Sequence, residues 1–184
     1  GGTSTVPGRD RPIHDQYTAM LKVVDELLRL GYRRLGVALE QALDLRVNGR
    51  WSAAYLQRRL LKGSRPLAPP LILDHPNQQT FNRWLDRYQP DAIISVDRFA
   101  LRLLEARGLR IPQDVAYASL DRDGDLGQGL EVSGINQNSQ LVGAAAVDML
   151  VAAIQRGQRG VPAQPLRTEV EGDWIIGDTT PEFT

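Results

Sequence analysis

Polar side chains that suit ligand binding follow most of the short apolar runs in this sequence. They are Glu40, Asp74, His75, Asp97, Asp121 and Gln137, with Arg46 near the start of a predicted helix. A carboxylate accepts hydrogen bonds, an arginine donates them through a planar fork, and an amide does both. Arg46, Asp121 and Gln137 therefore form a set that suits a hydroxyl-rich ligand such as a sugar, and His75 and Asp97 are further candidates.

Each of these candidates also has a structural interpretation. Asp97 is better explained as a helix cap, because its side-chain oxygen can accept a bond from a free backbone N–H. Arg46 can pair with a nearby carboxylate on the surface, and Asp121 can begin a turn. Gln137 can satisfy backbone groups at a crossover of the chain, and His75 precedes a proline that stiffens its loop. The three tryptophans are more often core residues than platforms for sugar stacking.

The segment from Pro90 to Asp125 predicts the sheet that positions these side chains. Residues 92–95 form a short apolar run, which suits a strand buried on both faces. Apolar residues then recur at helical spacing over 99–106, a glycine ends the helix, and residues 115–120 form a second apolar strand. Two such strands joined by a helix of about ten residues make a βαβ crossover, so we expect a parallel sheet. Ligands bind beyond the carboxyl ends of parallel strands.

The rest of the pattern adds further elements. Helices are predicted at residues 16–30, about 44–61, 78–88 and 141–156, and strands at 35–39, 71–73, 166–170 and 174–176. Residues 1–12 are rich in Gly, Pro, Ser and Thr, which predicts a disordered, tag-like leader. The folded part is therefore expected to be residues 13–184.

Composition narrows the class of protein. The chain has 184 residues, enough for one domain or slightly more, and its 22 basic residues balance 22 acidic ones. Without net positive charge there is no general attraction to phosphate backbones, so if the protein regulates DNA, its DNA-binding part is expected outside these residues. The absence of cysteine excludes disulfides, thiol nucleophiles and cysteine-ligated zinc. No apolar run approaches the ~20 residues of a membrane span.

Signatures of catalysis are missing from the sequence. There is no G-x-S-x-G elbow, and no glycine loop that could bind phosphate follows the first strand. The glycine-rich run 123–129 lacks the glutamate of a calcium loop, and the two histidines lack metal-site spacing. We therefore expect no enzyme activity, no metal and no cofactor.

Several motifs, in order along the chain, resemble one protein family. The stretch 90–121 has the pattern PDAII…D…L..L…GL.IP.DVA..SLD, an earlier stretch reads LGYRR.GVAL, and residues 46–49 match R-x-x-G. Together, over about residues 13–180, they resemble the effector-binding domain of the lactose-repressor/galactose-repressor (LacI/GalR) family of bacterial transcription regulators. In that family the positions of Asp121 and Arg46 face the effector. An Asn usually stands where this chain has Val96, and Ser95 is the nearest side chain that could replace its hydrogen bond.

The resemblance implies a fold and a domain organisation. The fold would be a three-layer αβα, parallel-sheet, Rossmann-like lobe of a periplasmic-binding-protein-like (type I) domain. Residues 13–184 would hold a complete C-terminal lobe plus helices 16–30 and 141–156 of the N-terminal lobe, without the helix-turn-helix head. A small effector, a sugar or a nucleoside-like molecule, would bind between the lobes and modulate DNA binding. Because one lobe would be mostly absent, we expect weak or no effector binding by this chain alone.

The resemblance also implies partners and a location. We expect a cytoplasmic homodimer, with helix 44–61 or its neighbouring strands in a symmetric interface, and contact with operator DNA only through the missing head. One alternative hypothesis is a sugar-type solute-binding protein of a transporter, which would share the fold. Another is a small α/β enzyme, which lacks a nucleophile and base at recognisable spacing.

Overall fold

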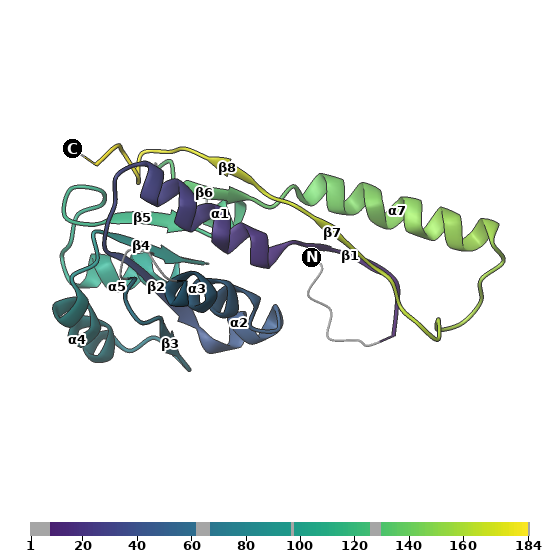
Figure 1. Ribbon diagram of the computed structural model, residues 1–184, viewed down its shortest axis with the longest axis horizontal. Coiled ribbons are helices and arrows are strands. Elements are labelled where there is room, and N and C mark those ends of the chain that lie inside the picture. The colour runs from purple at the N-terminus through teal and green to yellow at the C-terminus, as the bar shows by residue number, and fades with distance from the viewer. Residues whose placement is uncertain (1–7, 62–66, 97, 126–129, 184) are drawn as a thin grey trace.

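The computed structural model describes residues 8–61, 67–96, 98–125 and 130–183, which form two parts (Figure 1). We call residues 16–136 and 173–183 the packed unit, which contains a six-stranded sheet. Residues 8–14 and 139–170 form the extension, in which two strands and a long helix project from one side of the packed unit (Figure 1).

The sheet of the packed unit has the strand order β3-β2-β4-β5-β6-β8. The first five strands run parallel to their neighbours, and β8 pairs antiparallel with β6. The strands are β2 Leu35–Glu40, β3 Leu71–Leu73, β4 Ala92–Ser95, β5 Ala116–Ser119, β6 Ser133–Asn136 and β8 Asp173–Ile175. The parallel sheet predicted from the βαβ segment is therefore confirmed.

Helices cover both faces of this sheet, because successive strand residues point to opposite sides. Val37 and Ile94 pack into the core on the side of α1 (Gln16–Arg29) and α3 (Arg50–Leu60). Their neighbours Ala38 and Ile93 pack into a second core under α4 (Gln78–Tyr88) and α5 (Phe99–Ala106). The arrangement confirms the predicted three-layer αβα fold class.

Helix α1 lies in the packed unit and shares a core with α3, whereas the family resemblance predicts residues 16–30 in the N-terminal lobe. The helix begins at Asp15, whose carboxylate accepts a hydrogen bond from the backbone N–H of Thr18 at 3.0 Å. Its buried residues are Gln16, Ala19, Met20, Val23, Val24 and Leu27. The five apolar members of this set join the core that α3 also covers. The apolar stripe of α1 is therefore buried against the six-stranded sheet.

The extension consists of β1 (Arg11–His14), β7 (Arg167–Val170) and α7 (Ser139–Gln155). The two strands pair in parallel, with Ile13 opposite Glu169. Only Val142 of α7 is buried, and its exposed large apolar residues are Leu141, Val147, Leu150, Val151 and Ile154. Even so, among the described residues no helix combines the length and apolar character that crossing a membrane requires.

Candidate functional site

The parallel strands bring their carboxyl ends to one edge of the sheet, which we call the carboxyl edge. It comprises the ends of β3, β2, β4, β5 and β6 with the residues that directly follow them. The chain passes from β6 at this edge into α7, so the edge lies next to the junction with the extension (Figure 1). Glu40 is the last residue of β2, and the other candidate residues from the sequence come after one of these strands.

Asp121 and Gln137 lie together on neighbouring strands. β5 and β6 pair with Ser119 opposite Gly134. The backbone N–H of Asp121 donates to Ser119 Oγ at 3.1 Å, which fixes the turn after β5. Gln137 Nε2 donates to the carbonyl of Leu120 at 2.9 Å, so the two candidates are held side by side. Asp121 is partly exposed, whereas Gln137 is buried.

Arg46 is the exposed last residue of α2 (Gln41–Arg46), which follows β2 directly. The single helix predicted at about 44–61 is instead two helices, because Asn48 and Gly49 adopt left-handed backbone with φ of 57° and 67°. Asp44 is buried, and its carboxylate accepts the Oγ–H of Ser52 at 2.6 Å. That carboxylate therefore joins α2 to the first turn of α3.

His75 lies far from Gln137 along the carboxyl edge. It follows β3, the outermost strand, and is exposed, whereas Gln137 follows β6 at the fourth strand position beyond β3. At ~4.8 Å per strand, the two positions are roughly 19 Å apart. One small ligand cannot bridge them, so the structure does not bring His75 into the Asp121–Gln137 pair.

The end of β4 lies at the centre of the carboxyl edge. Ser95 is fully buried, and its Oγ has no hydrogen-bond partner among the described residues. Val96 is also buried and packs into the core on the α1 side, so it contributes apolar contact where the resembled family has an amide. Asp97 lies outside the described residues, and its capping or binding role stays a prediction.

A chain of buried hydrogen bonds at this edge was not predicted from the sequence. The indole Nε1–H of Trp51 donates to Gln16 Oε1 at 2.8 Å, and Gln16 Nε2 donates to Gln137 Oε1 at 3.3 Å. Together with the bond from Gln137 Nε2 to Leu120 O, we call this the amide chain. No local pattern marks Gln16, because its partner Gln137 is 121 positions away. Its burial could be inferred only from its place on the apolar side of α1.

Three crossing segments join the packed unit to the extension: residue 15 is the first, residues 137–138 the second and residues 171–172 the third. Polar contacts hold them together. His14 Nδ1 donates to the carbonyl of Gln137 at 2.7 Å, and the nitrogen must carry the proton because a carbonyl only accepts. Asn138 Nδ2 donates to Glu171 O at 3.0 Å and to Asp173 Oδ2 at 2.9 Å. A Cβ at Gly172 would lie 2.8 Å from the backbone oxygen of Asn136, so the crossing there requires glycine.

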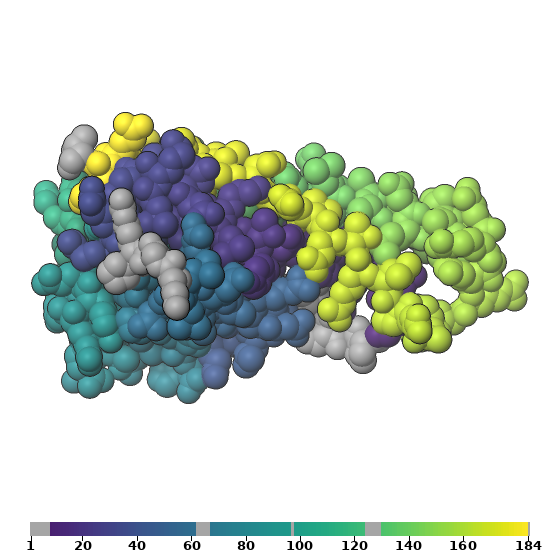
Figure 2. Space-filling view, viewed as in Figure 1, coloured from purple at the N-terminus to yellow at the C-terminus, as the bar shows by residue number. Residues whose placement is uncertain are grey.

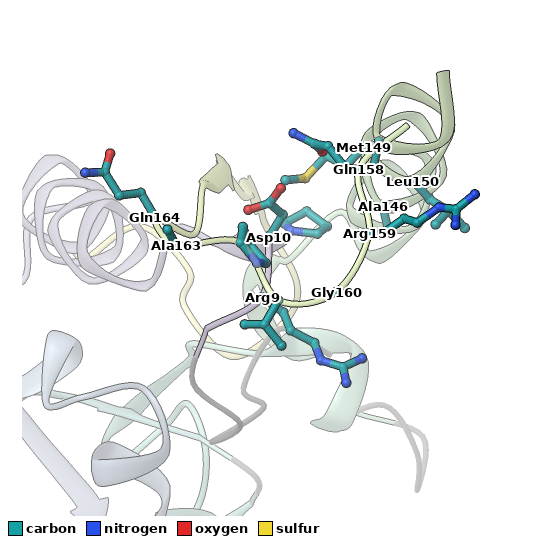
Figure 3. Close-up of a pocket in the computed structure, with 14 residues that line it drawn as sticks. Arg9, Asp10, Ala146, Met149, Leu150, Gln158, Arg159, Gly160, Ala163 and Gln164 are labelled. Carbon is teal, nitrogen blue, oxygen red and sulfur yellow. The ribbon is translucent and has the colours of Figure 1, made fainter. Parts of the chain in front are cut away.

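A hollow of about 730 Å³ lies on the extension rather than at the carboxyl edge (Figure 3). Its walls come from the C-terminal half of α7, residues 158–164, the chain before β1 and Pro12 of β1. Figure 3 shows that the guanidinium groups of Arg9 and Arg159 do not point toward one another. None of the ligand-binding residues predicted from the sequence lines this hollow.

The carboxyl edge carries side chains that can accept and donate hydrogen bonds. Within the described ranges, no three histidine or acidic side chains gather closely enough to hold a metal ion. Asp121 offers a carboxylate and Arg46 a guanidinium, which together can accept from and donate to hydroxyl groups. These are the donor and acceptor types that a hydroxyl-rich molecule requires.

Comparison with known proteins gives one family match. The family model described as "Periplasmic binding protein-like domain" matches residues 24–180. No curated protein sequence matches the chain.

Solved structures share the fold. A periplasmic binding protein/LacI transcriptional regulator from Alkaliphilus metalliredigens, complexed with D-xylulofuranose, is 19% identical with a TM-score of 0.70, over 93% of this chain and 65% of that one. A LacI family regulator from Enterococcus faecium with bound ribose is 15% identical with a TM-score of 0.67, over 98% and 69%. One from Arthrobacter, in complex with lactose, is 17% identical with a TM-score of 0.67, over 92% and 66%. The chain thus spans about two thirds of their length.

Proposed function

The chain belongs to the periplasmic binding protein-like domain family, and from this premise we propose that it is the effector-sensing part of a LacI-type bacterial transcription regulator. The observation that carries the proposal is the position of Asp121 and Gln137, side by side at the carboxyl edge, with Gln137 itself in the chain that crosses to the extension and bonded to His14. Structures with this fold hold ribose, xylulose and lactose, which supports a sugar as the effector. The proposed role is binding without catalysis.

The proposed mechanism follows from a ligand that contacts both parts of the molecule. Asp121 would accept hydrogen bonds from ligand hydroxyls, and Arg46 would donate to ligand oxygens. A ligand that also touches the extension favours one relative orientation of the two parts, and it shifts the population only by its difference in affinity for the two orientations. Each tenfold preference corresponds to about 1.4 kcal/mol. The change in orientation would alter binding to operator DNA through a DNA-binding segment outside residues 8–183.

A ligand screen tests the proposed function. Thermal shifts are measured with D-ribose, D-xylulose, lactose, cellobiose and nucleosides, for this chain and for any longer polypeptide that contains it. A ligand at 100 times its dissociation constant should add about 2.7 kcal/mol of stability. Asp121→Asn and Arg46→Ala should abolish the shift, and the control His75→Ala should retain it. A shift that survives both site variants would place the ligand elsewhere.

We also propose a homodimer that uses α3. The helix carries Leu56 and Leu60 on its exposed side, Leu61 follows it, and all three are more than a third exposed. Sedimentation velocity should show a dimer that Leu60→Asp converts to monomer, while the control substitution Leu150→Asp on α7 leaves it unchanged. A monomer at all concentrations would contradict this interface.

The alternative function is a solute-binding protein of a transporter, which has the same fold and would bind the same class of ligand. The two hypotheses differ in the response to DNA. A regulator should be released from, or recruited to, its operator by the sugar. A solute-binding protein should bind the sugar with no DNA association in any polypeptide that contains this chain.

A further inference from the structure

The amide chain has a fixed direction. Its first donor is the indole N–H of Trp51, which can only donate, and its last acceptor is the carbonyl of Leu120, which can only accept. The amides of Gln16 and Gln137 must therefore both turn their oxygens toward Trp51 and their nitrogens toward Leu120. All four residues are at most 6% exposed, so water does not offer a substitute for any of these bonds.

The amide chain joins the site to the crossing segments. Trp51 lies in the first turn of α3, shortly after Arg46, and Leu120 directly precedes Asp121. Gln16 follows the first crossing segment and Gln137 lies in the second. The backbone carbonyl of Gln137 also accepts the hydrogen bond from His14. A shift of the second crossing segment therefore acts directly on the backbone that carries Asp121, and through Gln16 on the helix that follows Arg46.

We propose that Gln16 and Gln137 are positioning residues that couple the orientation of the extension to the placement of Asp121 and Arg46. This inference rests on the proposed function and deepens it, because it assigns Gln137 to the coupling rather than to direct contact with the effector. Both amide ends of Gln137 are already bonded inside the protein.

Loss of one hydrogen bond in the amide chain should weaken the other bonds of the amide chain. Removal of one amide leaves a buried donor or acceptor without a partner, which costs roughly tenfold in the unfolding equilibrium constant. The remaining amide is then free to turn, so the indole of Trp51 loses a fixed acceptor even when the substitution is at Gln137. Bonds in such networks depend on one another.

The indole N–H resonance of Trp51 tests the coupling without any ligand. The chain has three tryptophans, and Trp84, which donates to Pro69 O at 2.8 Å, is an internal reference. Gln137→Leu should move the Trp51 resonance and speed its hydrogen exchange about tenfold or more. Gln78→Leu is the matched control, because it also removes two amide hydrogen bonds but lies on α4. An unchanged Trp51 resonance in a folded Gln137→Leu protein would overturn the proposal.

A second variant keeps the test decisive if Gln137→Leu does not fold. Gln137→Glu retains the acceptor for Gln16 but places a carboxylate oxygen against Leu120 O. The introduced carboxyl can donate to that carbonyl only when protonated, so burial should raise its pKa above the usual ~4.3. The Trp51 resonance should approach that of the wild type at low pH and depart from it as the pH rises through the raised pKa. Wild-type protein measured in parallel accounts for pH effects that do not come from the introduced carboxyl. A Trp51 resonance that stays at the wild-type position at every pH would contradict the coupling.

D-Ribose as a probe links the coupling to function. In a polypeptide that contains this chain and binds D-ribose, the sugar should shift the Trp51 resonance, whereas the Gln137→Leu variant of that polypeptide should still bind the sugar but leave Trp51 unmoved. If Gln137→Leu abolishes binding while the ligand-free Trp51 resonance stays in place, Gln137 is an effector contact and the coupling is wrong. If neither this chain nor any longer polypeptide that contains it responds to D-ribose, the proposed function loses support, and the ligand-free comparison still decides the coupling.

Discussion

The packed unit and the extension contain the same kinds of element but differ in how much of them is buried. Every residue of β4 and β5 is buried, whereas three of the four residues of β7 are exposed. Figure 2 shows the extension standing away from the packed unit as a thinner body. Backbone hydrogen bonds define both parts, but only the packed unit adds apolar burial on both faces of a sheet. The free energy of unfolding should therefore depend mainly on the packed unit.

This difference gives each part a distinct role in the proposed sensor. The carboxyl edge is built on buried strands, so its side chains are placed on a rigid platform. The extension is held at the crossings by polar contacts such as those of His14 and Asn138. A part held by few contacts can change orientation at small cost in free energy, which is what a ligand-driven switch requires.

The sharpest test of the comparison is one truncation in each part. Phe81 is fully buried in the core under α4 and α5, so Phe81→Ala should lower the free energy of unfolding by about 3–5 kcal/mol. Leu150 on α7 is 61% exposed, so Leu150→Ala should change it by no more than about 0.5 kcal/mol. Urea denaturation measures both. A large loss from Leu150→Ala would show that α7 is buried in solution, and the contrast between the parts would fail.

A buried carboxylate extends the test to polar contacts of the packed unit. Asp91 is 7% exposed, and its oxygens accept the backbone N–H groups of Arg33 and Arg34 at 2.9 Å. Asp91→Asn turns one acceptor into a donor that faces these N–H groups, so it should cost about 1.5–3 kcal/mol. The control Asp148→Asn, on the exposed surface of α7, should be neutral in the same urea titration. Equal losses of unfolding free energy in Asp91→Asn and Asp148→Asn would mean that burial of the carboxylate does not determine the loss.

The fold was largely predictable because buried strands leave a plain signal. Residues 92–95 and 115–120 are apolar runs, and the structure places a fully buried strand within each. Position in space was harder to predict than the existence of an element. The apolar stripe of α1 indicates that the helix packs against a sheet, but it does not distinguish the sheet of the packed unit from a sheet in an N-terminal lobe. The break between α2 and α3 comes from the left-handed backbone of Asn48 and Gly49, which helical periodicity does not reveal.

The candidate site was predictable in part for the same reason. Strand order brings Asp121 and Gln137 together and separates His75, but strand order cannot be read from one sequence. The polarity of the amide chain depends on residues that are distant in sequence. Its donor and acceptor ends become evident only when Trp51 and Leu120 are seen at opposite ends of it.

An ion pair between the two parts provides a smaller test. Arg50 at the start of α3 donates to Glu169 of β7 at 2.6 Å, and both side chains are more than a quarter exposed. Because solvent screens such a pair, Glu169→Gln should cost no more than about 1 kcal/mol. The difference from wild type, measured by thermal denaturation, should shrink further in high salt. A larger cost that is independent of salt would show that the extension is attached more firmly than its burial suggests.

The smallest expected effect on stability comes from the ion pair of Arg110 and Asp114, which are close in sequence and do not depend on packing of the packed unit or the extension. Arg110 hydrogen-bonds the exposed Asp114 four residues later and lowers the pKa of its carboxyl to about 2. A carboxyl whose pKa is depressed on folding contributes stability above its unfolded pKa of about 3.9, and loses it as the pH falls toward 2. NMR titration should find the low pKa in wild type and a return to the ordinary range in Arg110→Met. The low pKa should persist in Phe81→Ala under native conditions, because the contact is local in sequence. Its loss there would show that even this surface turn depends on the core of the packed unit.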